Sequence, residues 1–185
     1  MANKKHFVIT AIGKDRPGIV SAVTEVLYLN RCNIEDSSMT ILGGEFAVIM
    51  IVSAPAKLTQ NNLEHHFAKA AKRFSLNIQC KDVKLPPKYH SSETEKQNPH
   101  MISLLGADQP GLVYRVARLL ADQKINITDV NTKVVGSGKK PIYAMLIEVE
   151  LPKKLSPEKI KNELAKLGKK LKADITLKPV DVFQL

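Results

Sequence analysis

Residues 7–36 of this chain read FVITAIGKDRPGIVSAVTEVLYLNRCNIED, and residues 100–129 read HMISLLGADQPGLVYRVARLLADQKINITD. The two stretches align without a gap at an offset of 93 residues, and eleven of the thirty positions are identical. A repeat of this length indicates a duplicated domain. We therefore expect two related domains within the 185 residues, each large enough to support its own core.

The first repeat predicts six elements in the order βαββαβ. Its apolar residues switch between the period of a strand and the period of a helix, and glycines and prolines separate the segments. The predicted elements are a strand at 7–12 that ends at Gly13, a helix with apolar residues Ile19, Val20, Val23, Val26 and Leu27, a hairpin of strands 33–42 and 45–53 joined by Gly43 and Gly44, a helix after Pro55 with Thr59 near its N-cap, and a strand at 76–85.

The second repeat predicts the same order after a polar segment with three prolines at 86–99. Pro179 in the last strand indicates an edge position or a bulge. The predicted elements are a strand at 100–105, a helix lined by Leu112, Val113, Val116, Leu119 and Leu120, a hairpin of strands 125–135 and 142–151, a helix that begins at Ser156-Pro157 with the inward row Ile160, Leu164, Leu167 and Leu171, and a strand at 174–183.

This order predicts an α+β protein made of two ferredoxin-like domains. Each is expected to form an antiparallel four-stranded sheet with both helices on one face. The expected boundaries are 1–85 for the first domain, 86–99 for a linker and 100–185 for the second domain.

The repeated turn Gly-x-Asp-x-Pro-Gly-[Ile/Leu]-Val carries the chemistry of the repeat. Pro17 is expected to fix the start of the helix, and Gly18 to expose backbone N–H groups in its first turn. Such donors favour a carboxylate, while Asp15 offers a charge for an amine, so a zwitterionic amino acid would fit. Asn33 could add an amide contact. The alternative is a purely structural turn in which Asp15 caps the helix.

The strand, the Asp-x-Pro-Gly-[Ile/Leu]-Val turn, the apolar helix and the following Asn-Ile resemble an ACT domain, an amino-acid-sensing module. The resemblance covers both repeats and implies a ligand near the first loop and the following helix. The ligand-facing positions that it implies are Asp15, Gly18, Ile19 and Asn33 in the first repeat and Asp108, Gly111, Leu112 and Asn126 in the second.

Two such domains without an attached catalytic or DNA-binding domain resemble the family of glycine cleavage system transcriptional repressors. The resemblance implies a protein that binds glycine and restrains a transcriptional activator through protein–protein contact. The repeats differ at Arg16 and Gln109 and at Glu35 and Thr128, so one site or both could bind. Pairing into a homodimer stays open.

The net charge of +10 raises nucleic-acid binding as an alternative function. The charge is spread as +4, 0 and +6 over residues 1–85, 86–99 and 100–185, and much of the excess lies in the lysine-rich segment 153–172. No tryptophan or cluster of stacking aromatics accompanies these lysines. A solvated helix face or a docking surface for an acidic partner is therefore the expected role, and direct nucleic-acid binding is not expected.

The sequence shows no motif that is typical of a membrane-spanning protein, a metal-binding protein or an enzyme. The longest apolar run, 46–52, is too short to span a bilayer, so we expect a cytoplasmic protein. Cys32 and Cys80 fit reduced packing thiols, and the neighbouring His65 and His66 diverge on a helix, so no metal or cofactor is expected. No catalytic motif stands out, and residue 185 follows the last predicted strand, which leaves no room for the catalytic domain of a deformylase. We therefore expect a protein that is not an enzyme.

Overall fold

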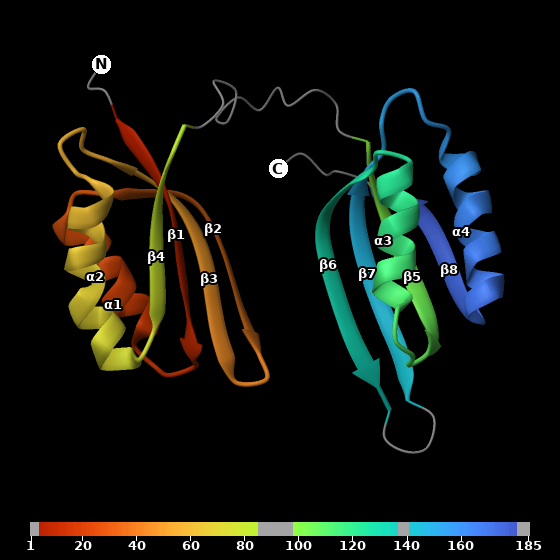
Figure 1. The fold of residues 1–185 in the computed structure, drawn as a ribbon, viewed down its shortest axis with the longest axis horizontal. Helices are drawn as coiled ribbons and strands as arrows, with labels where there is room; N and C mark the ends of the chain where they lie inside the picture. Colours follow the sequence, from red (N-terminus) through yellow and green to blue (C-terminus); the bar gives the residue numbers. More distant parts are fainter. Residues whose placement is uncertain (1–3, 85–97, 137–140, 181–185) are drawn as a thin grey trace. The chain divides into compact units, whose positions relative to one another are not determined.

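The computed structural model describes residues 4–84, 98–136 and 141–180. The chain divides into two compact units, Met1–His90 and Ser91–Leu185, which we name unit 1 and unit 2. Each unit contains one sheet and two helices in the order βαββαβ (Figure 1). The predicted α+β fold is confirmed in both units.

Unit 1 has an antiparallel sheet with the strand order β2-β3-β1-β4. Both helices lie on one face of this sheet (Figure 1). Alternate side chains of β1, such as Phe7 and Ile9, point to this face and pack against Ile19 and Leu27 of the first helix. The elements are β1 (Lys5–Lys14), α1 (Ile19–Leu29), β2 (Asn33–Leu42), β3 (Glu45–Ala54), α2 (Gln60–Phe74) and β4 (Asn77–Val83).

Unit 2 repeats this topology with the strand order β6-β7-β5-β8. Its core joins Ile102 and Leu104 of the central strand to Leu112, Val116 and Leu120 of the first helix. The elements are β5 (Pro99–Ala107), α3 (Leu112–Asp122), β6 (Asn126–Val135), β7 (Ile142–Glu150), α4 (Pro157–Leu171) and β8 (Ala173–Pro179).

Several local predictions are confirmed. Gly43 and Gly44 both have positive φ, as the tight connection between β2 and β3 requires. Thr59 is the N-cap of α2, where its hydroxyl accepts a hydrogen bond of 3.2 Å from the Asn62 N–H. Ser156 is the N-cap of α4, and Pro179 ends the edge strand β8. Residues 86–97 of the predicted linker lie outside the described residues, and β5 already begins at Pro99.

Gly13 and Gly106 differ from the prediction, because the strands do not end there. Gly13 pairs with Phe46 inside β1, and Gly106 pairs with Tyr143 inside β5. A Cβ on Gly13 would lie 3.0 Å from the Ser75 carbonyl oxygen, and one on Gly106 would lie 2.7 Å from the Ala173 Cβ. Close approach of the chain that follows the second helix therefore requires glycine at these positions.

Val20 and Val113 belong to the apolar residues that predicted the first helices, but they are not core residues. Val20 is 51% exposed and Val113 is 39% exposed, whereas the preceding Ile19 and Leu112 are buried. Successive residues of a helix point about 100° apart, so a residue next to a buried one can reach the surface. The two valines instead lie at the surface beside the repeated turn.

Candidate ligand site and helix grooves

The turn of unit 1, residues 15–19, connects β1 to α1. The Asp15 N–H donates a hydrogen bond of 2.8 Å to the Gly44 carbonyl oxygen, which ties the turn to the β2–β3 hairpin. The Ile19 N–H lies 3.4 Å from the Arg16 carbonyl oxygen that accepts its hydrogen bond. With Pro17 and Gly18 at the two central positions, residues 16–19 form a β-turn immediately before the helix.

Gly18 is the N-cap of α1 and lies outside its first turn, which corrects the predicted placement of Pro17 and Gly18. Its φ of +94° and ψ of −6° fit the third residue of a type II turn, where glycine avoids the steric cost of a Cβ. Asp15 does not cap the helix, because no side chain caps its first N–H groups. Among the described residues, the N–H groups of Val20 and Ser21 therefore lack a capping acceptor at the positive end of the helix dipole.

The turn of unit 2, residues 108–112, has nearly the same backbone angles at its glycine, but it is bonded to a different part of its unit. Gly111 has a φ of +93° and also precedes a helix without a side-chain cap. Gln109 replaces Arg16, and its side-chain Nε2 donates a hydrogen bond of 2.8 Å to the Leu171 carbonyl oxygen at the end of α4. The unit 2 turn is thus fixed to the second helix, whereas Arg16 is an exposed cation at the unit 1 turn.

The predicted ligand-facing residues fall into two groups by exposure. The side chains of Asp15 and Asp108 are exposed, as are the backbones at Gly18 and Gly111. The other predicted ligand-facing residues of the turns are core residues: Ile19 is 1% exposed and Leu112 is 2% exposed. Their side chains pack in the core between the helices and the sheet, so only their backbone can face a ligand.

Asn33 does not belong to the unit 1 turn, which corrects the predicted grouping. Asn33 pairs with Ser53, and Ser53 pairs with His6 near the start of β1. The turn follows Lys14 at the other end of that strand. Eight residues of strand separate the two ends by about 27 Å, too far for one small ligand to contact both within unit 1.

The same separation holds for Asn126 in unit 2. Asn126 pairs with Glu150, which pairs with Pro99 at the start of β5, whereas Asp108 follows the end of that strand. A register shift follows each asparagine, between Ile34 and Asp36 and between Ile127 and Asp129. Both asparagines therefore open a strand just before a bulge, at the opposite end of the sheet from the repeated turn.

A groove between the two helices of each unit is a feature that the sequence patterns did not reveal. The unit 1 groove lies between α1 and α2 and has a volume of about 340 Å³. It is lined by Ala22, Glu25, Val26, Leu29, His66, Lys69, Ala70 and Arg73. Only α1 and α2 supply these residues, and helical periodicity does not tell which residues of two helices face each other.

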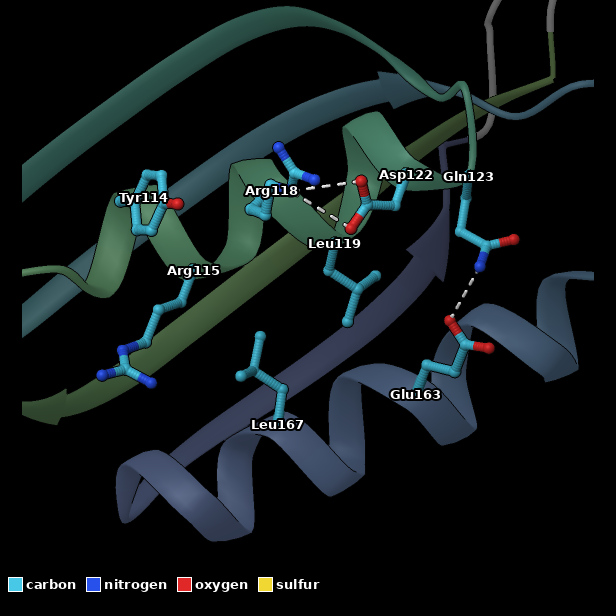
Figure 2. A pocket seen from close by; sticks show the side chains of 8 residues that line it. All are labelled: Tyr114, Arg115, Arg118, Leu119, Asp122, Gln123, Glu163 and Leu167. Atoms are coloured by element: carbon cyan, nitrogen blue, oxygen red, sulfur yellow. Dashed lines mark hydrogen bonds and ion pairs between the residues drawn. The ribbon is translucent and has the colours of Figure 1, made fainter.

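The unit 2 groove lies between α3 and α4 and has a volume of about 320 Å³. Figure 2 shows Leu119 and Leu167 approaching each other across the groove, with Tyr114 and Arg115 toward one end. Two interactions hold polar side chains of this groove in place. Arg118 forms an ion pair of 3.1 Å with Asp122, and the Gln123 side chain donates a hydrogen bond of 3.3 Å to Glu163 (Figure 2).

Cys80 and Cys32 are free thiols in the structure. Burial, with smaller contributions from Glu64 and Cys32, raises the pKa of the Cys80 thiol to about 12. Burial also raises the pKa of Cys32. Both thiols are therefore held in the protonated form, which is the less nucleophilic one.

The described part of the chain comprises residues 4–84, 98–136 and 141–180. No three His, Cys, Asp or Glu side chains in this part gather closely enough to hold a metal ion. None of its helices has the length and apolarity that crossing a bilayer requires.

Comparison with known proteins finds two copies of one domain, as the sequence repeat indicates. The ACT domain family model matches twice, over residues 5–81 and 99–178. A crystal structure of an unknown protein from Galdieria sulphuraria superposes with a TM-score of 0.80 at 24% sequence identity. The match covers 97% of this chain and 100% of that chain, so the fold extends over both repeats.

Two curated relatives match shorter parts of the chain. The glycine cleavage system transcriptional repressor of Escherichia coli (strain K12) is 47% identical over 53 residues, which cover 29% of this chain and only 28% of the repressor. A UPF0237 protein of Methanopyrus kandleri is 38% identical over 72 residues, which cover 38% of this chain and 80% of that protein. The two matches of the family model and the observed βαββαβ units lead to one conclusion: this chain is a tandem ACT domain protein and belongs to the ACT domain family.

Proposed function

We propose that this chain is a cytoplasmic, non-enzymatic regulator that binds glycine at the unit 1 turn and thereby changes its affinity for a transcriptional activator of glycine cleavage genes. ACT domains bind small ligands such as amino acids, which supports the sensing part. The partial match to the glycine cleavage system transcriptional repressor of Escherichia coli supports a role in the transcription of glycine cleavage genes. Glycine fits because it is a zwitterion without a side chain.

The observation that carries the proposal is the uncapped helix start at the unit 1 turn. The N–H groups of Val20 and Ser21 and the exposed Arg16 can receive the carboxylate of an amino acid. The exposed Asp15 can receive its ammonium group. Opposite charges beside one turn suit a zwitterion better than a simple anion.

The unit 1 turn is favoured over the unit 2 turn because their polar side chains are engaged differently. Gln109 of unit 2 is neutral and already bonded to the Leu171 carbonyl oxygen. Arg16 of unit 1 carries a charge and is exposed. A carboxylate gains more from a charged donor, because hydrogen bonds between ionised groups are about twice as strong as neutral ones.

Calorimetric titration of the full chain with glycine, L-alanine and L-serine tests the proposal. Glycine is expected to release or absorb heat that saturates. Asp15→Asn and Arg16→Gln should each weaken binding about tenfold or more, as expected for the loss of one charged hydrogen bond. The matched variant Asp108→Asn in unit 2 should bind as the wild type does. No saturable heat and no thermal shift with any of the three amino acids would rule out the sensing role.

The regulatory part requires coupling between glycine and the partner. A coupling free energy of about 1–3 kcal/mol would change the affinity for the activator by about 5–150-fold. Binding of the purified activator should therefore weaken by that factor when glycine is added at saturation. An affinity that is the same with and without glycine would contradict the regulation.

A second candidate function is direct binding to nucleic acid through α4. Five lysines of this helix are exposed: Lys159, Lys161, Lys166, Lys169 and Lys170. Lys161 pairs with Glu158 at 3.9 Å on the exposed surface, which neutralises little of this charge. A mobility shift with operator-length DNA that weakens steeply as salt rises would support this function. Absence of a shift at low salt would leave α4 as a solvated face.

A further inference from the structure

The unit 1 groove combines a small apolar floor with a basic rim. Ala22 and Val26 of α1 face Ala70 of α2 across the groove, so the floor offers space for inserted side chains. Leu29, the last residue of α1, also lines the groove and is 70% exposed. Leu29 extends the apolar surface of Ala22, Val26 and Ala70, and a contiguous apolar surface can be covered by a partner.

The lining residues on α1 have the spacing of a helix-binding groove. Ala22, Val26 and Leu29 follow one another at intervals of four and three residues, so they form one stripe along the helix. This stripe is about 10 Å long, which matches two turns of a docked helix. Amphipathic helices bind such grooves through apolar anchors at similar intervals.

The charges around the unit 1 groove favour an acidic occupant. Lys69 and Arg73 lie on the α2 side with His66, and Glu25 lies on the α1 side. Within residues 4–84, neither Lys69 nor Arg73 forms an ion pair with a carboxylate. Arg73 is held over the Phe74 ring, 5.0 Å from its centroid. Complementary charge guides such a surface toward negatively charged partners.

Lysines also occupy positions 166 and 170 of unit 2, which correspond to Lys69 and Arg73, but the residues that line the unit 2 groove differ from those of unit 1. Arg115 and Leu167 replace the floor residues Ala22 and Ala70. Asp122 replaces the exposed Leu29, and it is already paired with Arg118. Glu163 replaces His66 and accepts a hydrogen bond from Gln123 (Figure 2). The lining of the unit 2 groove therefore carries two positive and two negative side chains, and the hydrogen bond from Gln123 to Glu163 crosses it.

We infer that the unit 1 groove is a docking site for an acidic amphipathic helix of a protein partner, and that the unit 2 groove is not. The net charge of +10 on each chain disfavours a second copy as the occupant, since two such chains repel each other. This inference rests on the proposed regulation through a protein partner and assigns the surface that contacts it.

Fluorescence anisotropy with a labelled probe peptide tests the inference on the full chain. The probe is a designed amphipathic helix of about 18 residues, or about five turns, with a leucine stripe flanked by glutamates. A second peptide carries lysine in place of each glutamate. The glutamate peptide is expected to bind at least about tenfold more tightly than the lysine peptide, with the difference falling as salt rises.

Two variants locate the binding. Leu29→Asp imports the unit 2 residue, and Lys69→Glu reverses a rim charge; both positions are exposed, so folding should be preserved. Each is expected to weaken the glutamate peptide about tenfold or more, as the loss of an interface anchor or of charge complementarity does. The matched variant Lys166→Glu, at the equivalent position of α4, should bind as the wild type does.

Three outcomes would overturn the inference. The first is equal binding of the two peptides, and the second is a loss of binding in Lys166→Glu that equals the loss in Lys69→Glu. The third is sedimentation of the wild type as a dimer that Leu29→Asp converts to a monomer, because a second copy would then fill the groove. Glycine titration of Leu29→Asp separates this inference from the proposed function: unchanged glycine binding with lost peptide binding assigns the loss to the groove alone.

Discussion

The first helices of the two units begin with nearly the same backbone, φ +94° at Gly18 and +93° at Gly111, but the side chains around these glycines have different partners. In unit 2, Gln109 is bonded to the end of α4, and Glu163 and Asp122 are bonded across or along the groove. In unit 1, Arg16, His66 and Leu29 are exposed at the corresponding places. Unit 1 thus keeps binding groups available, while unit 2 uses its polar groups to hold its own elements together.

The largest difference that mutation should reveal concerns the packing of the second helix. Gly168 of α4 occupies the position of Ala71 in α2, and a Cβ at Gly168 would lie 2.6 Å from the Ala173 carbonyl oxygen. Gly168→Ala should therefore lower the free energy of unfolding by about 1–3 kcal/mol, as overpacking does. Ala71→Gly, the reverse exchange, should cost at most about 1 kcal/mol through helix propensity. Chemical denaturation measures both; equal effects would show that the helices pack alike.

The next effect tests the shared backbone of the turns. Gly18→Ala and Gly111→Ala place a Cβ in the left-handed region, and each should cost about 1–2 kcal/mol of unfolding free energy. The new Cβ meets only ordinary contacts, with Phe74 at 3.5 Å or Arg115 at 3.9 Å, so the two losses should be similar. Asn at either position should cost less, because asparagine tolerates this conformation. A loss in one unit only would contradict the common geometry.

A smaller effect should appear only at alkaline pH, and in unit 1. Cys80 pairs with Ile9 as Leu177 pairs with Ile102, so the two occupy equivalent buried positions. The folded pKa of Cys80 is raised to about 12 from an ordinary value of 9.0, so its stabilising contribution is complete below about pH 9 and is lost as pH rises toward 12. The melting temperature of the wild type should therefore fall more steeply above pH 9 than the melting temperature of Cys80→Val. Parallel curves would show that the thiol ionises equally in both states.

The smallest effect concerns the ion pair of the unit 2 groove. Arg118 and Asp122 are exposed and four residues apart on α3, so Asp122→Asn should lower the free energy of unfolding by only about 0.3–0.5 kcal/mol. High salt should reduce this difference. A loss above about 1 kcal/mol would mean that the groove of unit 2 has a structural role beyond this pair.

The sequence predicted the order of the elements because that information is local. The alternation of β1, the spacing of the α1 core residues and the Gly43-Gly44 connection each depend on residues that are close in the chain. The same holds for the repeated turn, whose glycine was recognised as a special backbone position. Its assignment to the first helical turn was wrong by one residue, since cap geometry is not visible in a pattern.

Long-range features could not be predicted in this way. The placement of Asn33 at the far end of the sheet depends on the register of β2 with β3 and of β3 with β1. The need for glycine at position 13 depends on Ser75 and Leu76, more than sixty residues later in the chain. Neither relation can be recognised from a short stretch of sequence, because each joins residues that are far apart in the chain.

The sequence by itself determined that this chain has two ACT domains with the same turn repeated in each, because local periodicity and repetition specify secondary structure and its order. The sequence also showed where the two repeats carry different residues, but only the tertiary structure decided which contacts those residues make. Strand register sets which residues lie near the turn, and helix packing sets which side chains face the groove between two helices. Both depend on contacts between residues far apart in the chain.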